Sequence, residues 1–180
     1  MFLLLFFSLA LGYPAPAAGK MAWQAAALGA PRYVPVTRYD PKRDPQADLV
    51  KALAEAKRTG RRVLLEVGGD WCSWCHVMDK LFADHADVRA LRERNFVTLK
   101  INMSPANENR AFLSLYHRIP GYPFLFVLDA DGKLVHPQRA NVFEDGDIYN
   151  VPSFAHFLTV YGPSPVPVNA RALAEACLDE

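Results

Sequence analysis

The sequence predicts an α/β domain in which helices flank both faces of a mixed central sheet. Three observations lead to this prediction. Apolar residues recur at helical spacing in several segments, and these segments alternate with short, continuously apolar runs that are typical of buried strands. A strand-helix-strand unit in the first half of the domain implies parallel pairing. The turn Asp129-Ala130-Asp131-Gly132 between two later strands implies an antiparallel hairpin.

Eight elements are expected between the chain's two ends. In order they are a helix over 44–59, a strand over 62–67, a helix from Cys72 that continues or restarts over 87–94, a strand over 96–101, a helix over 107–117, a strand over 124–128, a hairpin partner over 133–136 and a helix over 153–161. The order combines parallel and antiparallel pairing, which is why the sheet is predicted to be mixed.

The first helix and the first strand have clear local signals. Asp44 suits a helix start because its side chain can cap free amide groups, and Pro45 is tolerated in the first turn. Thr59-Gly60 ends the apolar periodicity. The strand that follows is apolar except for Glu66, so we expect it to lie centrally in the sheet.

The later elements follow from spacing. The strand over 96–101 alternates apolar residues with Thr98 and Lys100. Phe112, Leu115 and Tyr116 recur at helical spacing and predict the helix over 107–117. Residues 124–128 are all apolar, which predicts a buried strand.

The segments on either side of the domain are expected to form no further domain, and the segment before it is expected to lie on the domain as an extended lead-in. An apolar run at the start leads into Ala15-Pro16-Ala17-Ala18, which has the small-residue spacing of a signal-peptidase site, although no Lys or Arg precedes the run. The expected parts are a signal peptide over 1–18, an extended lead-in over 19–43, the domain over 44–161 and a Pro-rich linker and tail over 162–180.

Charge and composition exclude several classes of function. The chain carries 20 Lys and Arg against 19 Asp and Glu, without a basic stripe, so we expect no nucleic-acid partner. No segment reaches the roughly 20 apolar residues that cross a bilayer, so no stable membrane span is expected. Three cysteines are too few for a disulfide-stapled scaffold, which favours pairing within the C-x-x-C motif.

The motif Trp71-Cys72-Ser73-Trp74-Cys75-His76 is interpreted as a redox-active dithiol at the start of a helix. Free amide groups and the helix dipole stabilise a thiolate at this place, and the thiolate is the form that attacks a disulfide. Cys72 is therefore the predicted nucleophile. Cys75 follows one turn later on the same side and can resolve the mixed disulfide.

The C-x-x-C spacing also occurs in zinc sites and in haem-attachment sites. Zinc sites built on Cys normally take four ligands, and neither a second C-x-x-C nor an H-x-x-x-H is present, so no metal is expected. Residues 72–76 also satisfy C-x-x-C-H, the attachment signature of c-type haem, with His76 as axial ligand. The strand that precedes the motif favours the dithiol, and we expect no cofactor.

The run from Val63 to Cys75 resembles the active-site strand and helix start of the thioredoxin superfamily. By element order the resemblance covers residues 44–161. Within the superfamily, the W-C-x-x-C-H-x-M motif resembles small exported bacterial thioredoxin-like proteins. Residues 121–156 are also similar to the anterior-gradient type of the endoplasmic reticulum. The chain ends without a retention tetrapeptide, which favours the bacterial envelope.

The resemblance implies roles for four further residues. Pro123 would be the superfamily's cis-proline beside the dithiol, with Pro120 as the second choice, and the Tyr122 backbone would face the substrate. Glu66, six residues before Cys72, would be the buried acid that moves the proton of the resolving thiol, a role that desolvation favours. Trp71 would flank the dithiol, with plain core packing as the alternative. Independently of the resemblance, the charge of His76 could support the Cys72 thiolate, but a solvated helix position is favoured for this residue.

The predicted function is therefore thiol-disulfide exchange on protein thiols or disulfides in the periplasm or another extracytoplasmic compartment, with the endoplasmic-reticulum lumen as alternative. An unidentified redox partner would recharge the dithiol. Trp74 replaces the Gly-Pro pair of typical thioredoxins, so the resemblance does not carry over the direction of electron flow. The alternative function is a chaperone-like binding module with an incidental dithiol. Cys177 has no partner within the motif.

Overall fold

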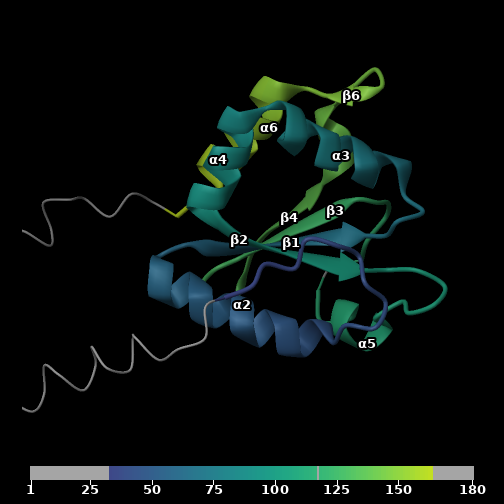
Figure 1. Cartoon of the computed structure of the whole chain (residues 1–180), viewed down its shortest axis with the longest axis vertical. Helices are drawn as coiled ribbons and strands as arrows, with labels where there is room; N and C mark the ends of the chain where they lie inside the picture. The colour runs from purple at the N-terminus through teal and green to yellow at the C-terminus, as the bar shows by residue number, and fades with distance from the viewer. Residues whose placement is uncertain (1–32, 117, 164–180) are drawn as a thin grey trace, which may run out of the picture. The chain divides into compact units, whose positions relative to one another are not determined.

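The computed structural model describes residues 33–116 and 118–163 of the chain. The predicted signal peptide and residues 164–180 of the predicted tail, including Cys177, lie outside the described residues. A four-stranded sheet forms the centre of the domain in the order β2-β1-β3-β4 (Figure 1). Its strands are β1 (Arg62–Gly68), β2 (Phe96–Asn102), β3 (Phe124–Leu128) and β4 (Leu134–Arg139).

The pairing of the strands confirms a mixed sheet. β1 runs parallel to β2, with Glu66 opposite Lys100, and antiparallel to β3, with Glu66 opposite Leu125. β3 and β4 form the antiparallel hairpin that the turn at 129–132 predicted. β1 is thus bonded on both sides, which explains why residues 63–67 are apolar apart from Glu66.

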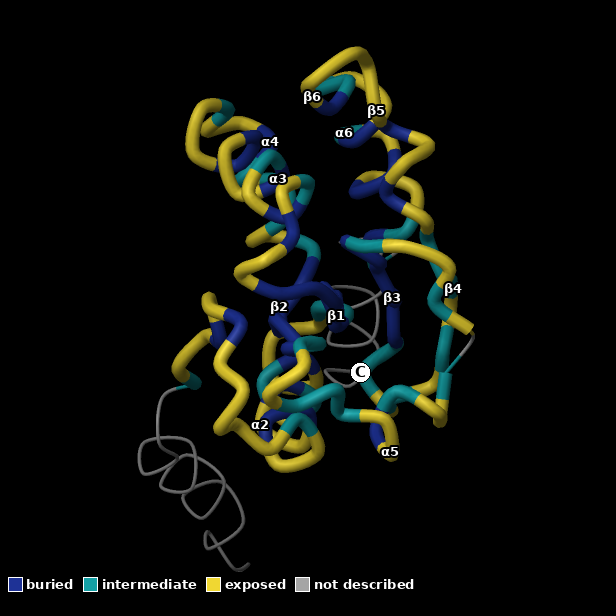
Figure 2. Tube along the Cα trace, turned by 90° about the vertical axis from the view of Figure 1, so that its right-hand side faces the viewer, coloured by how far each residue is buried: buried dark blue, intermediate teal, exposed yellow. Residues whose placement is uncertain are grey.

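Helices cover both faces of the sheet. Figure 1 shows the sheet between the two layers of helices. One face carries α2 (Pro45–Thr59) and α5 (Arg110–Leu113), and the other carries α3 (Ser73–Asp84), α4 (Ala86–Asn95) and α6 (Val151–Val160). Among the described residues, no helix has the length and apolar character needed to cross a membrane. In Figure 2, the residues along β1 and β3 are coloured as buried, and the outer helices carry many exposed residues.

The side chains on the two faces of β1 belong to two separate hydrophobic clusters. Val63, Leu65 and Val67 pack on the α2 side, whereas Leu64 packs on the α3 side. Because alternate residues of a strand point to opposite faces, Glu66 shares the α3 side with Leu64. The acid is thereby placed beneath the helix that carries the dithiol.

The helix starts follow the predicted capping. The Asp44 side chain accepts from the amides of Gln46 and Ala47 at the start of α2. The helix from Cys72 does not run on to residue 94: α3 ends at Asp84, His85 is the cap residue with an extended backbone, and α4 begins at Ala86. The restart, rather than the continuation, is the alternative that the structure adopts.

The predicted helix over 107–117 is mostly wrong, since α5 covers only Arg110–Leu113. Asn109 adopts a left-handed backbone with φ 48°, and its side chain donates to the Asn102 carbonyl at 2.7 Å. The Asn107 side chain accepts from the Asn109 amide at 3.0 Å. Such bonds between Asn side chains and the backbone compete with helix formation.

Residues 134–151 contain more structure than the sequence predicted. β4 continues past His136 to Arg139, with Pro137 on an edge strand where the missing amide is tolerated. A 3-10 turn and a small hairpin follow, and their elements are η1 (Ala140–Phe143), β5 (Glu144–Asp145) and β6 (Ile148–Tyr149). α6 begins at Val151 rather than Ser153, because the Asn150 side chain caps it.

The described part of the lead-in belongs to the core. Val36 forms a parallel bridge with Leu99 of β2, and its carbonyl accepts the Lys100 amide at 3.2 Å. Val36 and Tyr39 are both buried. The lead-in therefore continues the sheet edge and brings Tyr39 toward the dithiol.

Candidate functional site

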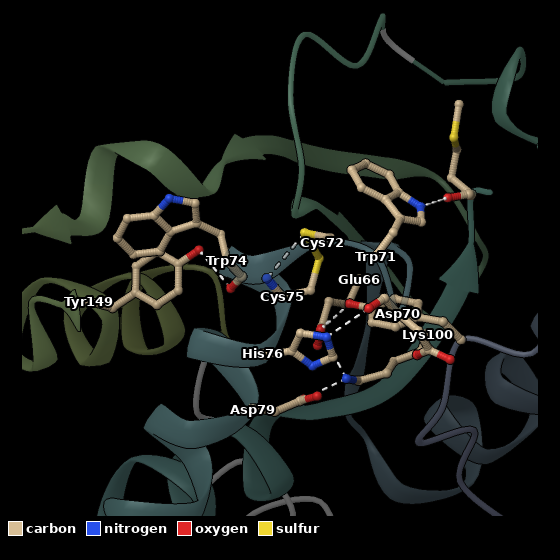
Figure 3. The surroundings of a disulfide bond; sticks show 12 residues. Glu66, Asp70, Trp71, Cys72, Trp74, Cys75, His76, Asp79, Lys100 and Tyr149 are labelled. Atoms are coloured by element: carbon tan, nitrogen blue, oxygen red, sulfur yellow. Dashed lines mark hydrogen bonds and ion pairs between the residues drawn. A yellow bond between two sulfur atoms is a disulfide. The ribbon is translucent and has the colours of Figure 1, made fainter. Parts of the chain in front are cut away.

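The two motif cysteines lie where β1 passes into α3, and their sulfur atoms form a disulfide (Figure 3). Gly68 ends β1, a short turn follows, and the Cys72 amide donates to the Gly69 carbonyl at 3.0 Å. Cys72 is the residue that caps α3, and Cys75 lies in its first turn. The predicted position at a helix start is confirmed.

The surroundings of the two sulfur atoms differ. Cys72 Sγ accepts a hydrogen bond from the Cys75 amide at 3.2 Å, so an amide of the first helical turn is directed at this sulfur. This amide and the helix dipole favour negative charge on Cys72. Cys72 is 4% exposed and Cys75 is fully buried, so a partner disulfide reaches Cys72 first.

Trp71 and Tyr122 form an aromatic border beside the disulfide. Their rings meet edge to face with 5.5 Å between centroids, and Tyr122 packs against the cluster that holds both cysteines. The Trp71 ring Nε1 donates to the Met103 carbonyl at 2.7 Å, which fixes the ring although 55% of the residue is exposed. Trp71 thus presents apolar surface next to Cys72.

The loop before β3 completes the border. The Tyr122-Pro123 peptide bond is cis, whereas Ile119-Pro120 is trans, so Pro123 has the conformation that the resemblance implied. Pro123 is buried, and the pocket at this loop is lined by residues 120–123 and 139–141. The role of Tyr122 and Pro123 in substrate binding remains a prediction.

Trp74, inside the motif, packs away from Trp71. Its ring contacts Tyr149 of β6 with 5.0 Å between centroids, and the Tyr149 hydroxyl donates to the Trp74 carbonyl at 3.4 Å. Burial raises the pKa of Tyr149, and the nearby Glu144 raises it further, so its hydroxyl stays neutral. The hairpin that the sequence did not predict therefore supports the dithiol helix.

His76 contacts the loop that precedes α3. Its Nε2 lies 2.8 Å from the Asp70 carbonyl oxygen, which can only accept, so Nε2 carries the proton of this bond. This contact ties the first turn of α3 to the preceding loop. A supporting role for the Cys72 thiolate remains a prediction, and the geometry favours a structural role.

Two buried charged residues, Glu66 and Lys100, lie beneath the disulfide in Figure 3, and the exposed Asp79 lies beside them. Glu66 is 1% exposed, and its Oε1 accepts the Tyr39 hydroxyl at 2.5 Å and lies 3.4 Å from Lys100 Nζ. Lys100 also donates to Asp79 of α3 at 2.5 Å. The expectation of a buried acid at position 66 is confirmed, while its part in proton transfer remains a prediction.

Sequence reasoning missed three members of this group, for different reasons. Lys100 could have been predicted, because parallel pairing of the two strands places it opposite Glu66. The alternation of apolar and polar residues in its strand suggested instead that its side chain faces solvent. Asp79 follows Cys75 by one helical turn and could have been found by that spacing. Tyr39 carried no signal, since it lies 27 residues from Glu66 in an unpatterned segment.

Residues 44–130 match the family model described as thioredoxin-like, over the same part of the chain that supplies β1, the dithiol and β3. These residues form a thioredoxin-like domain. Over 94 residues, the sequence is 33% identical to the thiol:disulfide interchange protein DsbD of Pseudomonas fluorescens. The matched stretch covers 52% of this chain and 16% of that relative. The chain thus spans only a small part of this relative's length.

Two solved structures agree with this thioredoxin-like assignment. A disulphide isomerase from Xylella fastidiosa Temecula1 is 26% identical, with a TM-score of 0.58, and the match covers 71% of this chain and 97% of that chain. The oxidised C-terminal domain of Neisseria meningitidis DsbD is 20% identical, with a TM-score of 0.50, covering 66% and 96%. The second likeness shows the thioredoxin-like fold alone.

The match to a thioredoxin-like family model favours the dithiol over the haem interpretation of residues 72–76. Both sulfur atoms that would bind a haem are joined to each other, and His76 Nε2 is bonded to the Asp70 carbonyl. The resemblance to the anterior-gradient type remains a prediction.

Proposed function

We propose that this thioredoxin-like chain is a thiol-disulfide oxidoreductase that acts on protein thiols or disulfides through Cys72 and Cys75. The observation that carries the proposal is the placement of Cys72, which caps α3 and accepts the Cys75 amide at the border of an exposed aromatic surface. The names of the relatives, a thiol:disulfide interchange protein and a disulphide isomerase, support it.

The exchange consists of two displacements. In the reducing direction, the Cys72 thiolate attacks a partner disulfide, forms a mixed disulfide and releases one partner thiolate, which takes up a proton. The Cys75 thiol then loses its proton and attacks Cys72 Sγ, which breaks the mixed disulfide and releases the second partner thiolate. The partner gains two electrons and two protons, and the pair ends as the disulfide seen in the structure.

Glu66 is the proposed proton acceptor for Cys75. It is the buried acid on the α3 side of β1, and its Oε2 makes no hydrogen bond within the described residues. A buried carboxylate near a thiol can take the thiol proton as the thiol becomes a nucleophile. In the oxidising direction the same groups act in reverse, and the reduction potential of the pair decides which direction prevails.

We further propose that the chain works outside the cytoplasm, in the periplasm or as a secreted protein. The support is the apolar start of the chain with its Ala-rich cleavage pattern, together with the oxidising chemistry that such compartments sustain. An unidentified redox partner would recharge the dithiol there. N-terminal sequencing of protein from the native host should find a chain that begins after residue 18, and an intact Met1 would contradict export.

Reduction of insulin by dithiothreitol, with the protein as catalyst, tests the exchange activity. Wild-type protein should accelerate the reaction, and Cys72→Ser should abolish the acceleration. Cys75→Ser should instead accumulate a mixed disulfide at Cys72, seen as an adduct on nonreducing electrophoresis that a reductant removes. Cys177→Ser serves as the control and should behave as wild type. Client binding without catalysis, unchanged in Cys72→Ser, would favour the chaperone-like module instead.

A further inference from the structure

Tyr39 enters the site from the lead-in, a segment separate from the dithiol helix and from β1. The bridge between Val36 and Leu99 holds the lead-in against the edge of β2, and Tyr39 follows three residues later. Tyr39 is 5% exposed and belongs to the same small cluster as Cys72 and Cys75. Its hydroxyl donates to Glu66 Oε1 at 2.5 Å.

The two carboxylate oxygens of Glu66 have different surroundings. Oε1 accepts the Tyr39 hydroxyl and lies 3.4 Å from Lys100 Nζ. Oε2 is also buried but has no hydrogen-bond partner within residues 33–116 and 118–163. A buried acceptor without a partner is rare and requires an explanation. A proton acceptor is one explanation, because it must keep a lone pair free until the proton arrives.

Gly68 shows how close Tyr39 comes to the resolving cysteine. A methyl group on its Cα would collide with Cys75 Sγ and would lie 3.1 Å from the Tyr39 hydroxyl oxygen. Gly68 and Glu66 are two residues apart on β1 and so point to the same face of the sheet. Cys75, Tyr39 and Glu66 therefore meet on one face of β1.

We propose that Tyr39 is a positioning residue for the resolving step, whose hydroxyl holds Glu66 through Oε1 so that Oε2 stays free to take the Cys75 proton. The proposal rests on the proposed function, because it assigns a role within the second displacement. The proton moves from Cys75 Sγ to Glu66 Oε2, and the electron pair left on sulfur forms the bond to Cys72. Tyr39 donates throughout and neither gains nor loses a proton.

The surroundings of Tyr39 suit a permanent donor. Burial raises the pKa of its hydroxyl well above the usual value of 10, and the charge of Glu66 raises it further, so the hydroxyl keeps its proton at neutral pH. Lys100 Nζ lies 4.4 Å from the centre of the Tyr39 ring and helps to hold it. The charged or titratable groups around the Tyr39–Glu66 pair are Lys100, Asp79, Arg92 and Tyr149.

Single-turnover kinetics with a coloured aromatic disulfide separates the two displacements. Reduced protein in a Cys177→Ser background should release one coloured thiolate when Cys72 attacks and a second when Cys75 resolves the mixed disulfide. Tyr39→Phe keeps the ring and removes only the hydroxyl. We expect the second phase to slow about tenfold at neutral pH and the first phase to stay unchanged. A tenfold effect is smaller than the rate enhancement of about a hundredfold or more that a positioned general base provides, because Tyr39→Phe leaves Glu66 itself in place.

The pH profile distinguishes positioning from general damage. Because Tyr39→Phe removes the donor to Glu66 Oε1, the pH dependence of the second phase should change, whereas that of the first phase should not. Tyr33→Phe is the matched control, because Tyr33 is a lead-in tyrosine whose buried hydroxyl has no hydrogen-bond partner among the described residues. That control should leave both phases and the profile unchanged.

A double mutant shows whether Tyr39 acts through Glu66. In a Glu66→Gln background, Tyr39→Phe should cause no further slowing of the second phase. An unchanged second phase in Tyr39→Phe, with Glu66→Gln slow, would overturn the Tyr39 proposal and leave the proposed function standing. Equal slowing by Tyr39→Phe in both backgrounds would also overturn it. Absence of the second phase in wild type would contradict the proposed function itself.

Discussion

The Trp71 and Tyr122 rings meet edge to face at a centroid distance of 5.5 Å, and the bond from Trp71 Nε1 to the Met103 carbonyl fixes their arrangement. The two rings come from different loops and border the same disulfide. They form a preorganised apolar surface at the place where a partner chain must approach Cys72.

Trp71→Ala should weaken the binding of protein substrates without changing the rate of thiol-disulfide exchange itself. We expect the KM for a protein disulfide to rise about tenfold, because an aromatic anchor of about 1–2 kcal/mol is lost. The rate with a small aromatic disulfide should stay within about twofold. Val50→Ala is the matched control, since Val50 is 59% exposed, close to the 55% of Trp71, but lies on α2. An unchanged KM in Trp71→Ala would remove Trp71 from the partner surface.

Glu66→Gln should slow the resolving step selectively. The amide keeps the shape of the side chain but cannot accept the Cys75 proton, so the second phase of the single-turnover reaction should fall about a hundredfold. The attack by Cys72 should be little affected. Asp48→Asn is the control, because Asp48 of α2 is another buried acid. Its carboxylate pairs with Arg43 at 2.6 Å. If Glu66→Gln leaves both phases unchanged, Glu66 has no part in proton transfer.

Gly68→Ala should destabilise the domain and disturb the dithiol together. The added methyl group collides with Cys75 Sγ and crowds the Tyr39 hydroxyl, and overpacking of this kind costs about 1–3 kcal/mol. Denaturant unfolding of the oxidised protein measures the loss. Gly121→Ala is the control, because nothing lies within 4 Å of its added methyl group. Equal stability of the two variants would contradict the close packing at Gly68.

Alkaline unfolding tests the environment of Tyr39. The pKa of its hydroxyl is raised in the folded state, so the stability that it contributes is fully present below pH 10 and is lost as pH rises above 10. The free energy of unfolding of wild type should therefore fall more steeply above pH 10 than that of Tyr39→Phe, by up to about 1.4 kcal/mol per pH unit. Parallel slopes would mean that the Tyr39 hydroxyl is not buried against Glu66.

The sequence was sufficient for the sheet, most helices and the dithiol, because these follow from local patterns. Continuous apolar runs marked β1 and β3, and Asp44 marked the start of α2. The helix over 107–117 failed because Asn side chains bind the backbone there instead of allowing a helix. The two-residue strands β5 and β6 are too short for any period to show.

The buried part of the site was only half predictable. Glu66 stood out because a charge on an apolar strand is unusual. Tyr39 could not be found in this way, because its role depends on a contact across 27 residues from a segment without periodicity. Such contacts depend on the packing of the whole domain rather than on any local pattern.

The reduction potential of the Cys72/Cys75 pair tests the central claim most directly. The Cys177→Ser protein should be equilibrated in glutathione buffers, and its free thiols trapped and counted by mass. A redox-active pair should pass from no free thiols to two in a single transition, within the range of about −270 to −120 mV that exchange proteins span. A pair that stays oxidised in the most reducing buffers would be a structural disulfide, and one that never oxidises would be no exchange site. Either result would contradict the account.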